Sequence, residues 1–181
     1  MLTKILIAAA IVIVVLLIVI ALQPSDFRVA RSATIAAPPT VVFEHVNDLH
    51  KWEDWSPWAK LDPNMKSRYE GATTGPGASY AWLGNNEVGE GRMTITESRP
   101  SDLVGIKLEF VKPFAATNAV EFTFKPEGPN TNVTWSMTGK KNYMAKAMHL
   151  VVNMDKMCGG MFEKGLTTMK SVVEATPARA L

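Results

Sequence analysis

Glu97 is the carboxylate of this sequence that is best placed for acid–base chemistry in an apolar environment. In segment 91–99 it alternates with Met93 and Ile95, so a strand here would place the three side chains on one face. A carboxylate in an apolar pocket has a raised pKa and can act as an acid or a base. The alternative is that Glu97, near the strand end and beside Arg99, reaches solvent, and we favour this alternative.

The other candidate residues predict no metal site. His45 and His50 are five positions apart and would not share a helix face, and His149 is distant in the sequence. Cys158 is the single cysteine, which rules out an intrachain disulfide and a cysteine zinc cluster. Three acidic residues near Lys51 are interpreted as a solvated group: Asp48, Glu53 and Asp54.

Glycine motifs and net charge exclude further classes of function. Gly75-x-Gly77 and Gly89-x-Gly91 are not followed by a helical pattern, so they indicate turns rather than phosphate-binding loops. The 19 basic and 17 acidic residues are scattered, which disfavours nucleic-acid binding. We predict no cofactor, no metal and no catalytic residue apart from the acid–base candidate Glu97.

The elements that would position a site begin after an apolar segment, Ile5 to Leu22. As a helix this segment would be about 27 Å long, close to the hydrocarbon thickness of a bilayer. A cleaved signal peptide is the alternative, but Ala21-Leu22-Gln23 is no small-residue cleavage site. We predict a single-pass anchor in a bacterial inner membrane. Lys4 on one side and Arg28 and Arg31 on the other leave the orientation open.

Period-two alternation predicts seven strands after this anchor. The first is Phe27 to Ile35, and a short helix follows Pro38-Pro39. Turn residues separate six more candidates: 67–70, 78–83, 91–99, 102–111, 119–125 and 133–139. The short turns predict an antiparallel meander. Alternation places on one large apolar face the side chains of Val104, Ile106, Leu108, Phe110, Val120, Phe122, Phe124, Val133, Trp135 and Met137.

The C-terminal segment, Asn142 to Glu174, is predicted to cover that apolar face with a long amphipathic helix. Its apolar series starts at Val151 and follows helical spacing. Gly159 and Gly160 each lower helix stability by about 1 kcal/mol relative to alanine, so they indicate a bend or a close backbone approach. The expected fold class is α+β, with a curved seven-stranded sheet wrapped around this helix.

Tryptophans at intervals of three, Trp52, Trp55 and Trp58, lie between the short helix and the second strand. They could close one end of a core, or they could rim a binding mouth or lie at a membrane interface. We favour the packing role.

Six short motifs between residues 27 and 174 carry a resemblance: Ile35-Ala36-Ala37-Pro38, Trp52-x-x-Trp55-Ser56-Pro57-Trp58, Gly75-x-Gly77-Ala78 with Trp82-x-Gly84, Val88-Gly89-x-Gly91, Thr131-x-Val133-Thr134-Trp135 and Phe162-Glu163-Lys164-Gly165-Leu166. In these motifs the sequence resembles the SRPBCC superfamily, and more narrowly its bacterial polyketide cyclase/dehydrase-like branch. The resemblance implies the helix-grip fold, which this branch shares with START lipid-binding domains. The superfamily uses one cavity for lipid transport, ligand binding, cyclisation and co-chaperone work, so the resemblance defines the fold more narrowly than the function.

The position of Gly165 in the C-terminal helix predicts a cavity. It lies in the apolar stripe between Met161, Phe162 and Met169, where a larger side chain would bury more apolar surface. We predict that the space beside it holds an apolar ligand bordered by five further residues: Phe110, Phe122, Trp135, Met157 and Met161. The alternative is that a bulky strand residue such as Trp135 fills the space directly.

Together these patterns predict a transmembrane anchor at 1–24, a helix-grip domain at 25–176 and a flexible tail at 177–181. We expect the membrane-tethered domain to bind a hydrophobic small molecule or lipid without transforming it. One alternative is a cyclase- or dehydrase-like enzyme that uses Glu97. Another is a protein-interaction domain similar to the heat-shock-protein ATPase activators, which share the fold.

Overall fold

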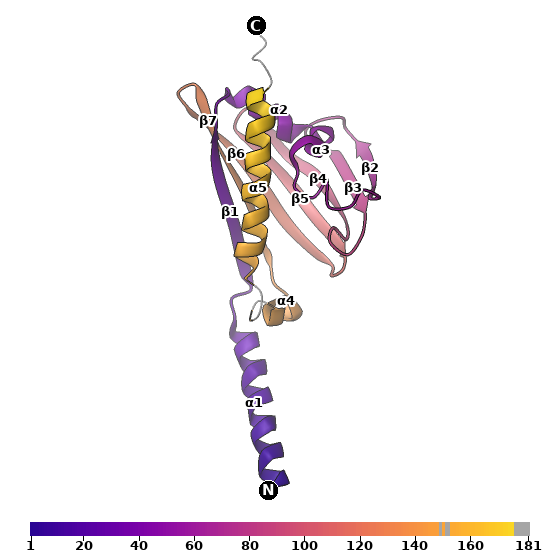
Figure 1. The fold of residues 1–181 in the computed structure, drawn as a ribbon, viewed down its shortest axis with the longest axis vertical. Coiled ribbons are helices and arrows are strands. Elements are labelled where there is room, and N and C mark those ends of the chain that lie inside the picture. The colour runs from indigo at the N-terminus through magenta and orange to yellow at the C-terminus, as the bar shows by residue number, and fades with distance from the viewer. Residues whose placement is uncertain (149, 151–152, 176–181) are drawn as a thin grey trace.

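The computed structural model describes residues 1–148, 150 and 153–175, and its central element is a seven-stranded antiparallel sheet (Figure 1). The strands are β1 (Asp26–Ile35), β2 (Lys66–Gly71), β3 (Ala78–Leu83), β4 (Glu90–Arg99), β5 (Leu103–Lys112), β6 (Ala116–Glu127) and β7 (Asn130–Lys140). Consecutive strands from β2 to β7 pair with one another, and β1 pairs with β7. The predicted antiparallel meander is confirmed.

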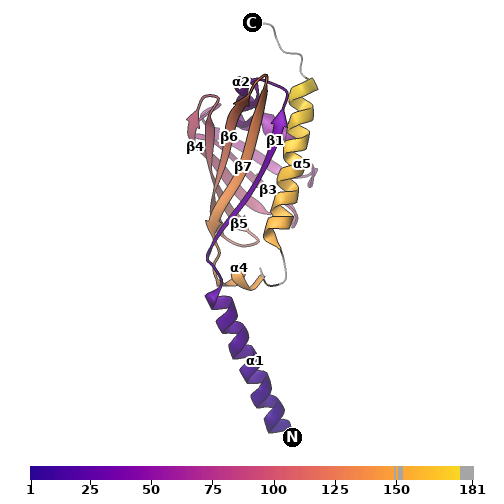
Figure 2. The same cartoon turned by 90° about the vertical axis from the view of Figure 1, so that its left-hand side faces the viewer.

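The helices are α1 (Leu2–Leu22), α2 (Pro39–Asn47), the 3-10 turn η1 (Leu49–Lys51), α3 (Trp52–Trp55), α4 (Tyr143–Met148) and α5 (Met154–Ala175). Pro39 begins α2, where its missing N–H costs nothing. The predicted long C-terminal helix is confirmed as α5, which lies along β1 in both views (Figures 1 and 2). It begins at Met154, however, and the start of the predicted segment forms the separate short helix α4. Val151, His149 and the predicted tail 177–181 lie outside the described residues.

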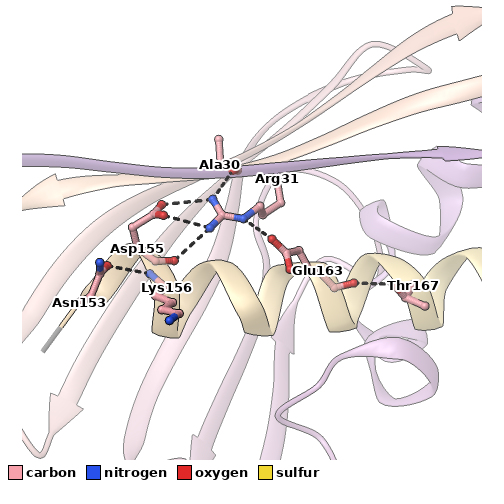
Figure 3. Close-up of polar contacts among 7 residues, drawn as sticks. All are labelled: Ala30, Arg31, Asn153, Asp155, Lys156, Glu163 and Thr167. Atoms are coloured by element: carbon pink, nitrogen blue, oxygen red, sulfur yellow. Dashed lines mark hydrogen bonds and ion pairs between the residues drawn. The ribbon is translucent and has the colours of Figure 1, made fainter.

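Arg31 of β1 fixes the first turns of α5 (Figure 3). Its Nε donates to Glu163 Oε1 at 2.6 Å, and its Nη2 donates to Asp155 Oδ2 at 3.0 Å. A Cβ at Gly159 would collide with this guanidinium. Gly159 is therefore explained by the close approach of a side chain, whereas the sequence suggested a bend or a close backbone approach.

Helix α1 extends away from the sheet on the side of α4 (Figure 2). Ile20 is the one buried residue of this helix. Within the described chain, α1 is the one helix that is long and apolar enough to span a membrane, a property that N-terminal signal sequences share.

Candidate functional site

The inner face of the sheet, which α5 partly covers, has a packed half and an open half. Along β5 the side chains of Val104 and Ile106 are buried, whereas those of Leu108 and Phe110 are partly exposed. The same change occurs along β4 between Ile95, which is buried, and Met93, which is not. On both strands the inner-face side chains become more exposed toward the end of the sheet that faces α1 (Figure 1).

The packed half lies under α2, α3 and α5. Trp135 of β7 stacks on Phe162 of α5, with ring centroids 4.2 Å apart, and on Phe122 of β6, with ring centroids 4.8 Å apart. Trp52 and Trp55 of α3 meet Phe122 edge to face. Aromatic burial of this kind contributes heavily to stability. The indole N–H of Trp135 has no hydrogen-bond partner among the described residues, so packing holds this ring in place.

Trp52 and Trp55 have the predicted packing role. Their side chains are buried, and each indole Nε1 donates to a carbonyl of α2, from Trp52 to Val46 at 3.0 Å and from Trp55 to His45 at 3.1 Å. These bonds satisfy the polar edge of each ring inside the core. The tryptophans therefore hold α2 and α3 over the packed half.

Trp135 and Pro57 occupy the space beside Gly165. A Cβ at this position would lie 2.8 Å from Trp135 Cζ3 and 3.0 Å from Pro57 Cδ. The geometry corresponds to the alternative in which Trp135 fills the gap. Gly165 thus allows α5 to approach the strands and the segment after α3 closely.

The open half is formed by six partly exposed side chains on the inner face of β2 to β5: Tyr69, Tyr80, Trp82, Met93, Leu108 and Phe110. The register joins them into one surface, because Tyr80 is opposite Tyr69 and Met93, and Leu108 is opposite Met93. Aromatic rings form contacts along it, with centroids 5.1 Å apart for Tyr69 and Tyr80 and 6.0 Å apart for Tyr80 and Trp82. It is a continuous apolar surface with few polar groups.

Polar groups lie at the β2 edge of the open half. The hydroxyl of Tyr69 donates to Glu53 Oε1 at 2.8 Å, and its ring stacks on His50 with centroids 3.9 Å apart. Burial and this hydrogen bond raise the pKa of Tyr69, and burial raises the pKa of Tyr80. Both tyrosines therefore stay neutral hydroxyl groups at physiological pH, and they give the open half one polar edge.

Glu97 is not on the inner face, because a β-bulge changes the alternation of β4. Ile95 pairs with Ile106 and Glu97 pairs with Gly105, so Thr96 is an extra residue. Glu97 consequently lies on the outer face, where its carboxylate is 3.1 Å from Arg99 Nη1 and half exposed. The favoured interpretation, a solvent-exposed Glu97, is confirmed. Ser98 takes the inner position and donates to Asn47 Oδ1.

The six residues of the predicted cavity are divided between the two halves. Phe122 and Trp135 are buried in the packed half, and Gly165 lies against Trp135. Phe110 belongs to the open half, where its ring meets Trp82 edge to face at 6.0 Å. Met161 is partly buried and Met157 is 53% exposed. At 100° per residue both lie on the side of α5 opposite Glu163 and β1.

Sequence reasoning did not assign five residues of the open half to the site: Tyr69, Tyr80, Trp82, Met93 and Leu108. Alternation already placed Met93 and Leu108 on the apolar face. The face of Tyr69 and Tyr80 depends on the register of β2, a strand of six residues with weak alternation. A hollow of about 570 Å³ lies elsewhere, between the ends of β1 and β7 and lined in part by Phe27, Arg28 and Lys140.

In the described part of the chain, no group of three or more histidine, cysteine, aspartate or glutamate side chains is arranged to hold a metal ion. Cys158 is a free, partly buried cysteine, and burial raises the pKa of its thiol. A thiol with a raised pKa is a poor nucleophile at neutral pH.

Comparisons with solved structures show the same fold. A protein from Thermus thermophilus matches with a TM-score of 0.59 at 18% identity over 84% of this chain and all of that one. The Aha1 dimer from Colwellia psychrerythraea gives 0.58 at 12% identity over 82% and 96% of the two chains. A Chromobacterium violaceum protein gives 0.57 at 15% identity over 83% and 99%. A search of curated proteins found no match.

The family comparison covers the whole sheet together with α5. The model of a family described as polyketide cyclase / dehydrase and lipid transport matches residues 26–174. This range starts at the first residue of β1 and ends one residue before the end of α5. The chain therefore belongs to the polyketide cyclase/dehydrase and lipid transport family.

Proposed function

We propose that this protein binds a hydrophobic small molecule or lipid on the open half of its inner face, while α1 holds it at a membrane. The observation that carries the proposal is the partly exposed apolar surface of β2 to β5, which continues directly from a buried core. Continuous exposed apolar surface of this kind is typical of ligand-binding and interaction sites.

The chemistry of the open half fits a flexible, apolar ligand. Met93 and Leu108 offer aliphatic contacts, and Trp82 and Phe110 offer ring faces. Covering such surface releases about 25 cal/mol per Å² of apolar area, so an acyl chain gains affinity without specific polar contacts. The polar edge at Tyr69 and Glu53 would meet the more polar end of the ligand.

Helix α5 would provide the wall of the site. Met157 and Met161 lie on its side opposite β1, and methionine adapts to varied apolar partners. In this proposal Phe110, Met157 and Met161 of the predicted cavity contact the ligand. Phe122, Trp135 and Gly165 form the rigid layer behind it.

The family supports the proposal, because its description includes lipid transport. The outward placement of Glu97 weighs against the enzyme alternative that depended on this residue. A binding role requires only the apolar surface, whereas a cyclase- or dehydrase-like reaction also requires an acid or base directed at the ligand.

Photo-crosslinking in vesicles tests the proposal. The full-length protein is reconstituted with a phospholipid that carries a diazirine in its acyl chain, and the crosslinked peptides are identified by mass spectrometry. We expect crosslinks in β3 to β5 as well as in α1. Leu108→Gln should reduce the β3 to β5 crosslinks several-fold and leave those of α1 unchanged, because it places an amide in the apolar surface.

Glu109→Gln is the matched control, since Glu109 is the neighbour of Leu108 on the outer face and its change should affect neither set of crosslinks. Crosslinks confined to α1 and the segments around it would contradict binding on the inner face. Equal losses in both variants would contradict the assignment of the site to the open half.

A further inference from the structure

Helix α4 is joined to the C-terminal turns of α1 by polar contacts. The hydroxyl of Tyr143 donates to the carbonyl of Leu17 at 3.2 Å, and Lys146 Nζ donates to the carbonyl of Ala21 at 3.1 Å. Just before α4, the N–H of Lys141 donates to the carbonyl of Ser25 at 2.7 Å. Two hydrogen bonds thus join α4 to α1, and a third joins the segments next to the two helices.

These contacts determine the depth of α4 once α1 lies in a bilayer. Helix α1 has 21 residues, which corresponds to about 31 Å and matches the hydrocarbon core. Leu17 lies about one turn below Ala21, which belongs to the last turn of α1 at the boundary between acyl chains and headgroups. Tyrosine is enriched at this level, and a lysine there extends its ammonium toward the headgroups. A helix bonded to both positions lies at the membrane interface.

The surface of α4 fits that location. Met144 and Met148 are one turn apart on the same side of the helix, and they are 58% and 42% exposed. Leu150, which follows α4, is 47% exposed. Lysines accompany these apolar side chains on and just before the helix: Lys140, Lys141 and Lys146. Apolar side chains beside lysines are complementary to a leaflet that contains anionic lipids.

The strand directions bring the open half to the same end of the molecule. β7 ends and β1 begins beside α4, and the β5–β6 turn with the 57% exposed Phe114 is at this end of the sheet. Leu108 and Phe110 precede that turn. An interfacial α4 would therefore hold the open half close to the lipid from which a ligand would enter.

We propose that α4 is a membrane-docking helix that inserts Met144 and Met148 into the interface of the leaflet beside α1, with Lys140 and Lys141 at anionic headgroups. This inference rests on the proposed membrane anchoring by α1. It is independent of whether a ligand occupies the open half.

Fluorescence quenching by lipids tests this arrangement in the full-length protein. A polarity-sensitive fluorophore is attached to Met144→Cys or Met148→Cys in a Cys158→Ala background, in vesicles of phosphatidylcholine and phosphatidylglycerol. Lys125→Cys is the control site, because Lys125 is exposed near the β6–β7 turn, at the far end of the sheet from α1 (Figure 1). We expect phospholipids with a spin label near the top of the acyl chain to quench the first two sites several-fold more than the control.

The outcomes separate this inference from the anchor and from the ligand site. Protein that floats with vesicles, with all three labels equally accessible to water, would overturn the docking of α4 alone. Protein that does not float and lacks residues 1–22 by intact mass would overturn the anchor and the docking together. Diazirine crosslinks to α4 of the unsubstituted chain provide a second measurement that does not depend on the Cys158→Ala background.

A double variant tests how much the charges of Lys140 and Lys141 contribute to the docking of α4. Lys140→Gln/Lys141→Gln keeps the backbone bond to Ser25 and removes two positive charges. In the parent protein, phosphatidylglycerol should increase quenching at the Met148 site, and the double variant should lose most of this increase. An equal increase in both proteins would overturn the headgroup contact.

Discussion

The two halves of the inner face belong to one sheet, share β4 and β5 and follow the same alternation of side chains, and they differ in what covers them. In the packed half, α2, α3 and α5 bury the side chains, as with Phe122 and Val104 at 0% exposure. In the open half, Leu108 and Phe110 of the same sheet remain partly exposed. The packed half contributes the larger share of buried apolar surface, and the open half is the surface on which we propose that a ligand binds.

The difference shows how one apolar face can serve both purposes. Tryptophans from α3 contact the strands at Phe122 and Trp135, so aromatic rings fill this region and are buried there. The open half has aromatic contacts along the sheet, such as that between Trp82 and Phe110, and less cover above it. One apolar face can therefore form a buried core at one end and stay partly exposed at the other.

Truncation of a phenylalanine in each half gives the largest expected effect. Phe122→Ala should lower the free energy of unfolding by about 3–5 kcal/mol, because the surrounding rings cannot close the cavity. Phe110→Ala should lower it by about 1 kcal/mol, because its ring is only partly buried. Chemical unfolding of the full-length protein in detergent measures both. Similar losses at the two positions would contradict the division into halves.

Overpacking at Gly165 is expected to have the next largest effect. Gly165→Leu should lower the free energy of unfolding by about 1–3 kcal/mol, because the new side chain meets Trp135 and Pro57. Gly160→Leu is the control, since a Cβ there meets no other described atom within 4 Å. It should be neutral or stabilising. A stable Gly165→Leu variant that loses lipid crosslinks would instead place a ligand cavity beside α5, in the packed half.

Titration of the tyrosines of the open half is expected to have the smallest effect. The pKa values of Tyr69 and Tyr80 are raised in the folded protein from the ordinary value of 10.0, so above about pH 10 the folded state retains protons that the unfolded state releases. Stability should therefore be complete below about pH 10 and fall as the pH rises further. Partial exposure limits the contribution of each tyrosine to about 0.5 kcal/mol.

The Tyr69→Phe/Tyr80→Phe variant isolates this contribution. Its free energy of unfolding should decrease less than that of the parent between about pH 9 and about pH 11, because no tyrosine of the open half then titrates. An identical decrease in both proteins would show that these hydroxyl groups are as solvated in the folded state as in the unfolded state.

Local patterns were sufficient to predict most of the fold. Alternation identified all seven strands, helical spacing identified α5, and the run from Ile5 to Leu22 identified the helix that became α1. Alternation also gave the correct inner face for Val104, Phe122 and Trp135. These features depend on residues that are close in sequence, and the side-chain period of a regular strand leaves only two choices of face.

Only the tertiary structure decided which part of the inner face is covered and which residues form the candidate site. An alternating pattern predicts which side chains share a face of the sheet. Which of those side chains are buried depends on where α2 and α3, from a distant part of the chain, pack against that face. The bulge at Thr96 placed Glu97 on the outer face, because one extra residue shifts every later side chain. At Gly165 the sequence predicted a ligand, with Trp135 as the alternative, and the packing of α5 against β7 brings the indole to this position.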